Sequence, residues 1–250
     1  MQPFLSIVIP AYNEERRIGA SLEAIKAYLA SKAWRYEIVI ADDGCSDNTE
    51  QVVRSILGAN GPLIYLKGGQ NQGKGNAVKR GMLASTGEFS LLTDADLSTP
   101  IEEFDKFLVH LTSADSVVTG TRKTIGANVT KHQAFIRENM GKCFTLFTNV
   151  ILSLGQSDYT CGFKVFGQAA RQRIFSAARI DRWGYDSEIF FLAKLFGFTV
   201  TEVPVVWANS EATRVNLLLD SARSFKELFE IRWNQAGGKY KVGPIRKNLC

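Results

Sequence analysis

The sequence predicts an α/β fold with a mostly parallel, doubly wound sheet, and two observations lead to this prediction. Short apolar runs that are typical of buried strands alternate with amphipathic helical stretches over the first hundred residues. Acidic or glycine-rich clusters follow these runs. Because the carboxyl ends of parallel strands share one edge of a sheet, where such sheets bind their ligands, we expect these clusters to meet in one site.

The first half of the chain contains four predicted strands, which cover residues 5–10, 36–41, 63–66 and 89–92. Pro10 ends the first strand, and Asn13 is expected to cap a helix that reaches about residue 31. A second helix is expected to start near Ser46 and to reach Leu57, and a third follows the glycine-rich segment 68–76.

The second half begins with a strand over residues 117–123 that ends in basic residues, and a polar loop follows it. A long segment over residues 131–154 is nearly all apolar from Cys143 onward. It is either a core helix or the lining of an access path for an apolar substrate. The remaining elements are a turn into a strand at 158–166, a helix at 183–195 and an edge strand at 199–207.

Two carboxylates end the fourth strand in the pattern Asp94-Ala95-Asp96. Alternation along an extended chain points the two aspartates to the same side, with Ala95 facing away. Hard carboxylate oxygens at this spacing suit Mg²⁺ or Mn²⁺, which can share its coordination with a substrate diphosphate. The alternative is a solvated acidic turn, which is a common feature of loops.

The glycine-rich segment predicts a loop that opens a helix and brings backbone amides close to an anion. Gly73 and Lys74 stand at the predicted helix start, and the lysine adds positive charge. The segment matches neither the phosphate-binding G-x-x-x-x-G-K-[ST] pattern nor G-x-G-x-x-G. By itself it is also compatible with a plain flexible loop.

The composition is that of a soluble globular protein, with a formal net charge of +5 and only two histidines. No stretch offers the ~20 apolar residues of a spanning helix, and no room is expected for a signal peptide. The cysteines are scattered without a C-x-x-C pair, which predicts reduced thiols in the cytosol. They are Cys45, Cys143, Cys161 and Cys250.

Three segments are expected along the chain. Residues 1–212 form the α/β domain, and residues 213–236 form an amphipathic helix that either docks on it or rests on lipid headgroups. Residues 237–250 are basic and poor in large apolar groups, so they are expected to be a mobile tail.

The ordered motifs resemble glycosyltransferase family 2, and most closely its polyprenyl- and dolichyl-phosphate hexosyltransferases. The resemblance runs from Ser6 to about Leu219. It is carried by the segments 9–14, 41–47, 71–75 and 94–97, and the lipid-phosphate branch is indicated by the segments 119–122, 160–164 and 185–188. It implies a single GT-A domain that binds a nucleotide-diphospho-sugar.

The resemblance also implies roles for single residues of the donor and metal sites. The base and ribose pocket would be lined by Pro10, Tyr12, Glu14, Asp42 and Asp43. Asp94 would lie on the ribose or metal side, and Asp96 would be the main ligand of Mg²⁺ or Mn²⁺. Gly73, Lys74 and Ala95 complete the predicted donor-binding set.

Two basic residues would hold the acceptor phosphate, namely Arg122 and Arg137. The implied reaction is a metal-dependent, inverting transfer of a hexose to a polyprenyl or dolichyl phosphate at the cytosolic face of a membrane. UDP-glucose is the favoured donor and GDP-mannose the next. The chain would contact the membrane peripherally or through an anchored partner.

Two other functions remain open from the sequence. A family 2 enzyme with a hydroxyl acceptor would need a catalytic base, and Asp158, Asp186 or Glu188 could serve. A non-catalytic basic protein that binds a membrane or nucleic acid is the other alternative. The many carboxylates expected along one edge argue against nucleic acid as a partner.

Overall fold

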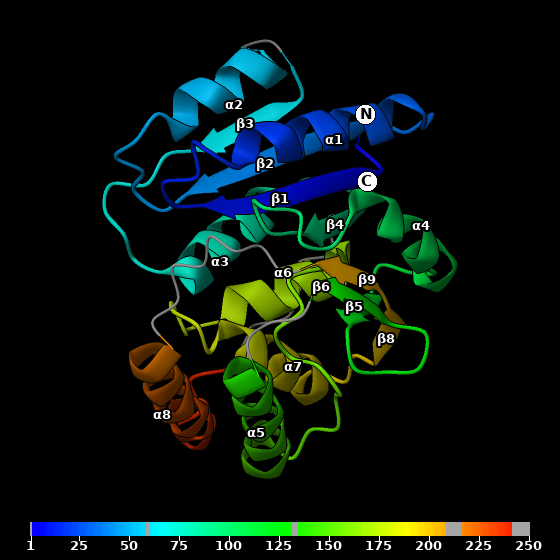
Figure 1. The fold of residues 1–250 in the computed structure, drawn as a ribbon. Coiled ribbons are helices and arrows are strands. Elements are labelled where there is room, and N and C mark those ends of the chain that lie inside the picture. Colours follow the sequence, from blue (N-terminus) through cyan, green and yellow to red (C-terminus); the bar gives the residue numbers. More distant parts are fainter. Residues whose placement is uncertain (1, 59–60, 132–134, 209–216, 242–250) are drawn as a thin grey trace.

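The computed structural model describes residues 2–58, 61–131, 135–208 and 217–241, and it contains a central seven-stranded sheet (Figure 1). The strands lie in the order β3-β2-β1-β4-β7-β5-β8. Their bounds are β1 Leu5–Ala11, β2 Tyr36–Asp42, β3 Leu63–Leu66, β4 Phe89–Leu92, β5 Val117–Thr121, β7 Lys164–Gly167 and β8 Val200–Pro204.

The first four strands run parallel, and β7 is inserted antiparallel between β4 and β5. The edge strand β8 pairs parallel with β5. The predicted α/β class with a mostly parallel sheet is therefore confirmed. The parallel arrangement brings the carboxyl ends of β1, β2 and β4 to one edge of the sheet.

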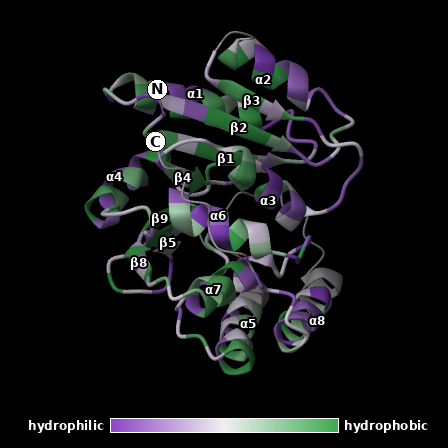
Figure 2. Cartoon of the chain, turned by 180° about the vertical axis from the view of Figure 1, so that it is seen from behind, coloured by the Kyte–Doolittle hydropathy of each residue, from purple (hydrophilic) through white to green (hydrophobic). Residues whose placement is uncertain are grey.

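Helices cover both faces of the sheet and form two apolar cores (Figure 1). One core contains side chains from α1 (Ile18–Ala30), α2 (Thr49–Leu57) and α4 (Phe104–Phe107). The other contains side chains from α3 (Lys74–Ala84), α6 (Gln168–Ala177) and α7 (Tyr185–Leu195). Strand residues alternate between the cores, since Ile7 and Ile9 belong to the first and Val8 to the second. In Figure 2 the strands at the centre of the molecule are largely green, hence hydrophobic, whereas the helices around them mix green with purple.

Two further helices pack on each other and contribute side chains to the second core, namely α5 (Phe135–Leu152) and α8 (Leu217–Ala236). The Phe225 ring of α8 lies 5.5 Å from the Phe144 ring and 5.4 Å from the Phe147 ring, both on α5. After α8 the chain turns back to the domain, where Tyr240 is buried. Residues 209–212 of the predicted α/β domain, 213–216 of the predicted helix and 242–250 of the predicted tail lie outside the described residues.

Several local expectations were wrong. The single strand over 199–207 is divided, because after β8 the chain forms β9 (Val206–Ala208), which pairs with β6 (Asn128–Lys131) in a separate two-stranded sheet. Asn13 does not cap α1, which begins at Ile18. Instead Asn13 has a φ of 56°, and its side-chain oxygen accepts hydrogen bonds from the backbone amides of Ser46 and Asp47. The helix α6 and two short 3₁₀ turns, Ile101–Glu103 and Leu108–His110, were not predicted.

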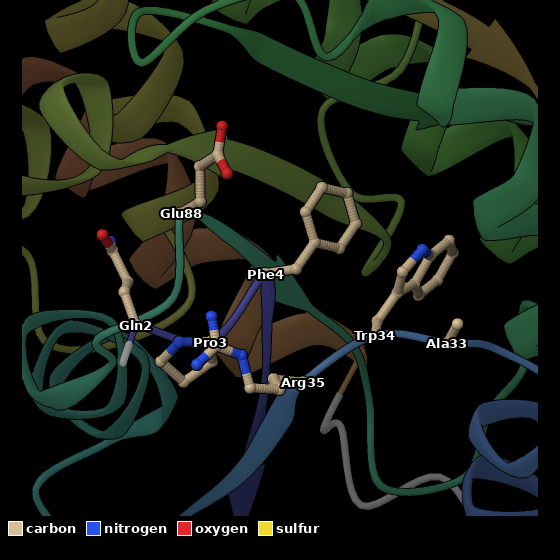
Figure 3. Close-up of a pocket in the computed structure, with 7 residues that line it drawn as sticks. All are labelled: Gln2, Pro3, Phe4, Ala33, Trp34, Arg35 and Glu88. Carbon is tan, nitrogen blue, oxygen red and sulfur yellow. The ribbon is translucent and has the colours of Figure 1, made fainter.

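A surface pocket lies at the edge of the sheet where β1, β2 and β4 begin (Figure 3). It is lined by the residues just before these strands, including Phe4, Trp34 and Glu88. The acidic clusters follow the same strands at their opposite ends. This pocket is therefore separate from the predicted ligand-binding edge.

Candidate active site

The loops after β1 and β2 are joined by hydrogen bonds at the carboxyl edge of the sheet. The Asp43 amide donates to the carbonyl of Ala11 at 2.9 Å. The Asn13 amide lies 3.2 Å from the Cys45 sulfur, and the Glu14 amide donates to the Thr49 hydroxyl at 2.7 Å. The predicted donor residues of both loops are thereby brought together, with the Tyr12 side chain 39% exposed and Pro10 inside β1.

Asp42 and Asp43 are buried, and their carboxylates organise the neighbouring loops. Asp42 accepts bonds from the amides of Gly44 and Cys45 and from the Tyr65 hydroxyl. Asp43 accepts bonds of 2.9 Å from the amides of residues 72 and 73, at the end of the glycine-rich segment. These two aspartates therefore fix the positions of the loops, and their predicted contact with a nucleotide stays a prediction.

Lys74 connects the glycine-rich segment to the acidic turn after β4. Its ammonium lies 2.6 Å from the Asp94 carboxylate, and both side chains are partly exposed. Burial by itself would raise the pKa of Asp94, but Lys74, Lys164 and Arg122 hold the pKa below its usual range. Asp94 is therefore ionised at neutral pH and lies within the field of three cations.

The backbone of the segment before β7 passes directly against Asp94. A Cβ atom built on Gly162 would overlap the Asp94 carboxylate. Only glycine leaves room for the carboxylate at this point. Gly162 therefore belongs to the site, although the sequence prediction used it only as part of the family resemblance.

Ala95 and Asp96 follow Asp94 in the turn after β4. Ala95 is buried, and its carbonyl accepts a 2.7 Å bond from the Ser21 hydroxyl of α1. The Asp96 carboxylate is 19% exposed and lies 3.5 Å from the Arg17 guanidinium. Arg17 also forms a 2.7 Å ion pair with Glu14, so the turns after β1 and β4 share one cation.

The predicted metal ligands, Asp94 and Asp96, are carboxylates of the turn after β4. Among the described residues, no three His, Cys, Asp or Glu side chains are grouped closely enough to hold a metal alone. Two partly exposed carboxylates, Asp94 and Asp96, are present at one turn. One or two carboxylates plus substrate phosphates are the usual ligands of protein-bound Mg²⁺, so these residues fit a cation that binds together with a diphosphate.

Arg122 follows β5, and protein groups hold its guanidinium on several sides. Asp158 accepts bonds of 2.7 Å from Nε and 2.8 Å from Nη2, and the Thr160 hydroxyl lies 2.7 Å from Nη2. The guanidinium carbon lies 5.0 Å from the centre of the Trp207 ring. Arg137, the second predicted basic residue, belongs to α5, but its side chain lies outside the described part of the chain.

The fully buried Lys164, which acts electrostatically on Asp94, was not predicted as a site residue. The Lys164 ammonium donates bonds of 2.6 Å to the Asp186 carboxylate and to the Cys161 carbonyl. A buried ammonium requires such partners, because an unpaired charge in the interior is costly. Asp186 was predicted only as a candidate base, and its pairing with Lys164 has no local signal, because the two residues lie 22 positions apart in the sequence.

Comparisons with known proteins identify the family of the chain. The family model described as glycosyl transferase family 2 matches residues 6–175. The chain is similar to the dolichyl-phosphate beta-glucosyltransferases of Dictyostelium discoideum and Saccharomyces cerevisiae, at 32% and 33% identity. These matches cover 96% and 95% of this chain and 77% of each relative.

Solved structures resemble the fold at lower identity. Glucosyl-3-phosphoglycerate synthase from Mycobacterium tuberculosis, in complex with Mn²⁺ and UDP-glucose, superposes with a TM-score of 0.63 at 19% identity. That match covers 94% of this chain and 79% of that one. The mannosyltransferase PcManGT from Pyrobaculum calidifontis, in complex with GDP-mannose and Mn²⁺, has a TM-score of 0.61 at 16% identity, covering 96% and 71%. With the family-model match and the two relatives, the chain belongs to glycosyl transferase family 2 and is a glycosyltransferase.

Proposed function

We propose that this chain transfers a hexose from a nucleotide-diphospho-sugar to dolichyl or another polyprenyl phosphate, with UDP-glucose as the favoured donor and GDP-mannose as the next. The observation that carries the proposal is the position of Asp94 between the glycine-rich segment and Arg122. Lys74 pairs with Asp94 at 2.6 Å, and Arg122 influences the same carboxylate electrostatically. This arrangement suits a donor diphosphate on one side and an acceptor phosphate on the other. The names of the relatives support the same acceptor and sugar.

Asp94 and Asp96 would hold Mg²⁺ or Mn²⁺ together with the donor diphosphate. A bound cation of this kind supplies charge neutralisation of the departing nucleoside diphosphate. Lys74 lies at the start of α3, where helix amides and its ammonium favour an anion. The buried carboxylates of Asp42 and Asp43 keep the surrounding loops in place.

Arg122 would orient the acceptor phosphate for attack on the anomeric carbon. Its Nε and Nη2 groups contact Asp158, and Nη1 takes no part in these two bonds. A phosphate monoester has its second pKa near about 6, so the nucleophile is already ionised at pH 7 and needs no strong base. A single displacement would convert an α-linked donor into a β-linked lipid-phosphate sugar.

The contacts of three carboxylates favour this acceptor over a hydroxyl. Asp158 is paired with Arg122, and Asp186 with the buried Lys164. Glu188 is fully buried and accepts bonds from two backbone amides and from the Tyr240 hydroxyl. A general base must reach the proton that it removes, and these carboxylates are committed to internal partners.

We also propose a peripheral position on the cytosolic face of a membrane. Among the described residues, no helix combines the length and apolar character that crossing a bilayer requires. The outer surface of the α5–α8 pair instead exposes large apolar side chains beside the exposed Lys142 and Lys226. Such a surface suits anionic lipid headgroups. The exposed apolar residues are Leu146, Phe147, Val150, Phe229 and Trp233.

The experiment is a donor and acceptor panel with the purified chain. Binding of UDP- and GDP-sugars is measured calorimetrically with Mn²⁺, with Mg²⁺ and with EDTA, followed by transfer to a short-chain polyprenyl phosphate or to saccharides. Cation-dependent UDP-glucose binding and β-linked transfer to the lipid phosphate are expected. Transfer to saccharides alone would overturn the proposed acceptor, and cation-independent turnover would overturn the proposed metal.

A further inference from the structure

Residues 179–184, the loop before α7, form a wall against which the glycine-rich segment packs. The amide of Asn76 donates to the Asp181 carbonyl at 3.0 Å, and its side chain to the Asp181 carboxylate at 3.1 Å. Cβ atoms built on Gly73 and Gly75 would overlap the carbonyls of Asp181 and Ile180. The two glycines therefore let residues 73–76 lie directly on residues 180–182.

Lys74 stands between these two glycines, so its position depends on the same wall. Its ammonium lies 5.7 Å from the centre of the Trp183 ring and 2.6 Å from the Asp94 carboxylate. A shift of residues 179–184 would move Lys74 away from Asp94. The wall thus controls a group of the proposed donor site without being part of it.

The start of the wall is held by the segment after α8. Glu188 accepts hydrogen bonds from the amides of Arg179 and Ile180, and its Oε1 atom accepts a 2.7 Å bond from the Tyr240 hydroxyl. The Arg179 guanidinium donates bonds of 3.0 and 2.8 Å to the Lys239 carbonyl. Tyr240 is 4% exposed and Glu188 fully buried, so water cannot replace these bonds readily.

The end of the wall is held by α8 itself. The Gly184 amide donates a 2.6 Å bond to the Glu227 carboxylate of α8. A Cβ atom built on Gly184 would lie 2.7 Å from the Glu227 Cβ atom, so the two backbones are in close contact. Both ends of residues 179–184 are therefore attached to the C-terminal part of the chain.

We propose that Tyr240 and Glu227 are positioning residues for the donor site, because they clamp residues 179–184 against the glycine-rich segment. This inference rests on the proposed function only for the identity of the donor. Whatever the donor is, α8 and the residues after it determine how rigidly Lys74 is held. Loss of either clamp loosens residues 73–76 and weakens donor binding, while the Arg122 side of the site is unaffected.

The test compares Tyr240→Phe with Tyr28→Phe, which is a matched control. Tyr28 lies on α1, is 7% exposed and donates a 2.7 Å bond to the Asp105 carboxylate. Each variant loses one tyrosine–carboxylate bond, and Tyr240→Phe is expected to lose more thermal stability, because Glu188 is fully buried whereas the Asp105 carboxylate is 48% exposed. Hydrogen–deuterium exchange of residues 72–78 is expected to accelerate in Tyr240→Phe only. Equal exchange in both variants would overturn the inference, whatever the donor.

The kinetic part separates a positioning role from a general loss of stability. The KM for UDP-glucose is expected to rise about fivefold in Tyr240→Phe and Glu227→Ala, a size typical of one lost hydrogen bond. The KM for the lipid phosphate is expected to stay unchanged. Glu227→Gln keeps an acceptor for the Gly184 amide and should restore the donor KM. Equal rises in both KM values would contradict the proposed role, whereas absence of wild-type UDP-glucose binding would refute only the proposed donor.

Discussion

The Asp158 carboxylate holds the Arg122 guanidinium through two parallel hydrogen bonds, of 2.7 Å to Nε and 2.8 Å to Nη2. The Asp158 side chain is fully buried, whereas that of Arg122 is 16% exposed. A bidentate pair of this kind fixes the plane of the guanidinium as well as its position. Arg122 is thereby presented at the end of β5, beside the Trp207 ring, in a defined orientation.

The first prediction concerns Asp158→Asn. The amide cannot accept both guanidinium bonds, so the guanidinium loses its fixed orientation and its charge partner. We expect the KM for a polyprenyl phosphate to rise at least tenfold, while the Kd for UDP-glucose changes by less than about twofold. Steady-state kinetics and calorimetry measure the two effects. A lower donor affinity with an unchanged acceptor KM would refute the assignment of Arg122 to the acceptor side.

The second prediction concerns acid stability and rests on the same Arg122–Asp158 pair. Burial would raise the pKa of Asp158, but Arg122 and Lys123 hold the pKa well below its usual range. A carboxylate with a lowered pKa stabilises the fold fully above its unfolded pKa of about 4, and this contribution is lost as the pH falls toward its folded value. Urea unfolding should show a wild-type advantage over Asp158→Asn that is constant from pH 5 to 7 and decreases below about pH 4. A constant difference down to pH 2 would contradict the ion pair.

The third prediction concerns the acidic turn after β4. Asp96→Ala and Asp94→Asn are expected to lower kcat/KM by about a hundredfold or more, because the first removes a proposed metal ligand and the second removes the negative charge of one. Asp115→Asn is the control, since Asp115 is exposed just before β5, at the other edge of the sheet. Transfer assays over a range of Mn²⁺ concentrations check the result. A fully active Asp96→Ala enzyme would defeat the proposed metal site.

The fourth prediction concerns the close approach of Gly162 to Asp94. An added methyl group at Gly162 would overlap the Asp94 carboxylate and displace it from Lys74. Gly162→Ala is therefore expected to weaken UDP-glucose binding in the presence of Mn²⁺ by about tenfold or more. Gly155→Ala is the control, because a Cβ atom at Gly155 meets nothing within 4 Å. Equal donor affinity in the two variants would show that the position of Asp94 has no effect on binding.

The sequence was sufficient to predict the parallel part of the fold and the convergence of its loops. Strand periodicity and the polar clusters after each strand are local signals, and they placed Asp43, Lys74 and Asp94 at one edge. The pairs that complete the site are not local. Arg122 and Asp158 lie 36 positions apart, and they meet because β7 inserts antiparallel between β4 and β5. No periodic pattern in a single sequence records such a pairing.

The start of the first helix was predicted wrongly for a different reason. Asn13 has the side chain of a helix cap, and the glutamates after it favour a helix start. In the fold its side-chain oxygen instead accepts bonds from amides of the loop after β2, and α1 starts five residues later. A tertiary hydrogen bond replaced the local one. The buried position of Tyr240 was equally hidden, since its partner Glu188 lies 52 positions away.

The last prediction concerns the exposed apolar side chains of α8. Phe229 and Trp233 are 64% and 75% exposed, and they lie one helical turn apart on the surface that also carries Lys226. The double variant Phe229→Gln/Trp233→Gln is expected to lower the affinity for vesicles of phosphatidylcholine with phosphatidylserine by about tenfold or more, because both rings lose their transfer into the interface. The control is Val109→Gln/Ile125→Gln, which replaces residues that are 75% and 103% exposed elsewhere on the surface. Co-sedimentation should also weaken with salt, since the lysine attraction to the headgroups is screened. If the control lost as much vesicle binding as the α8 variant, the α5–α8 pair would not be the lipid-facing surface.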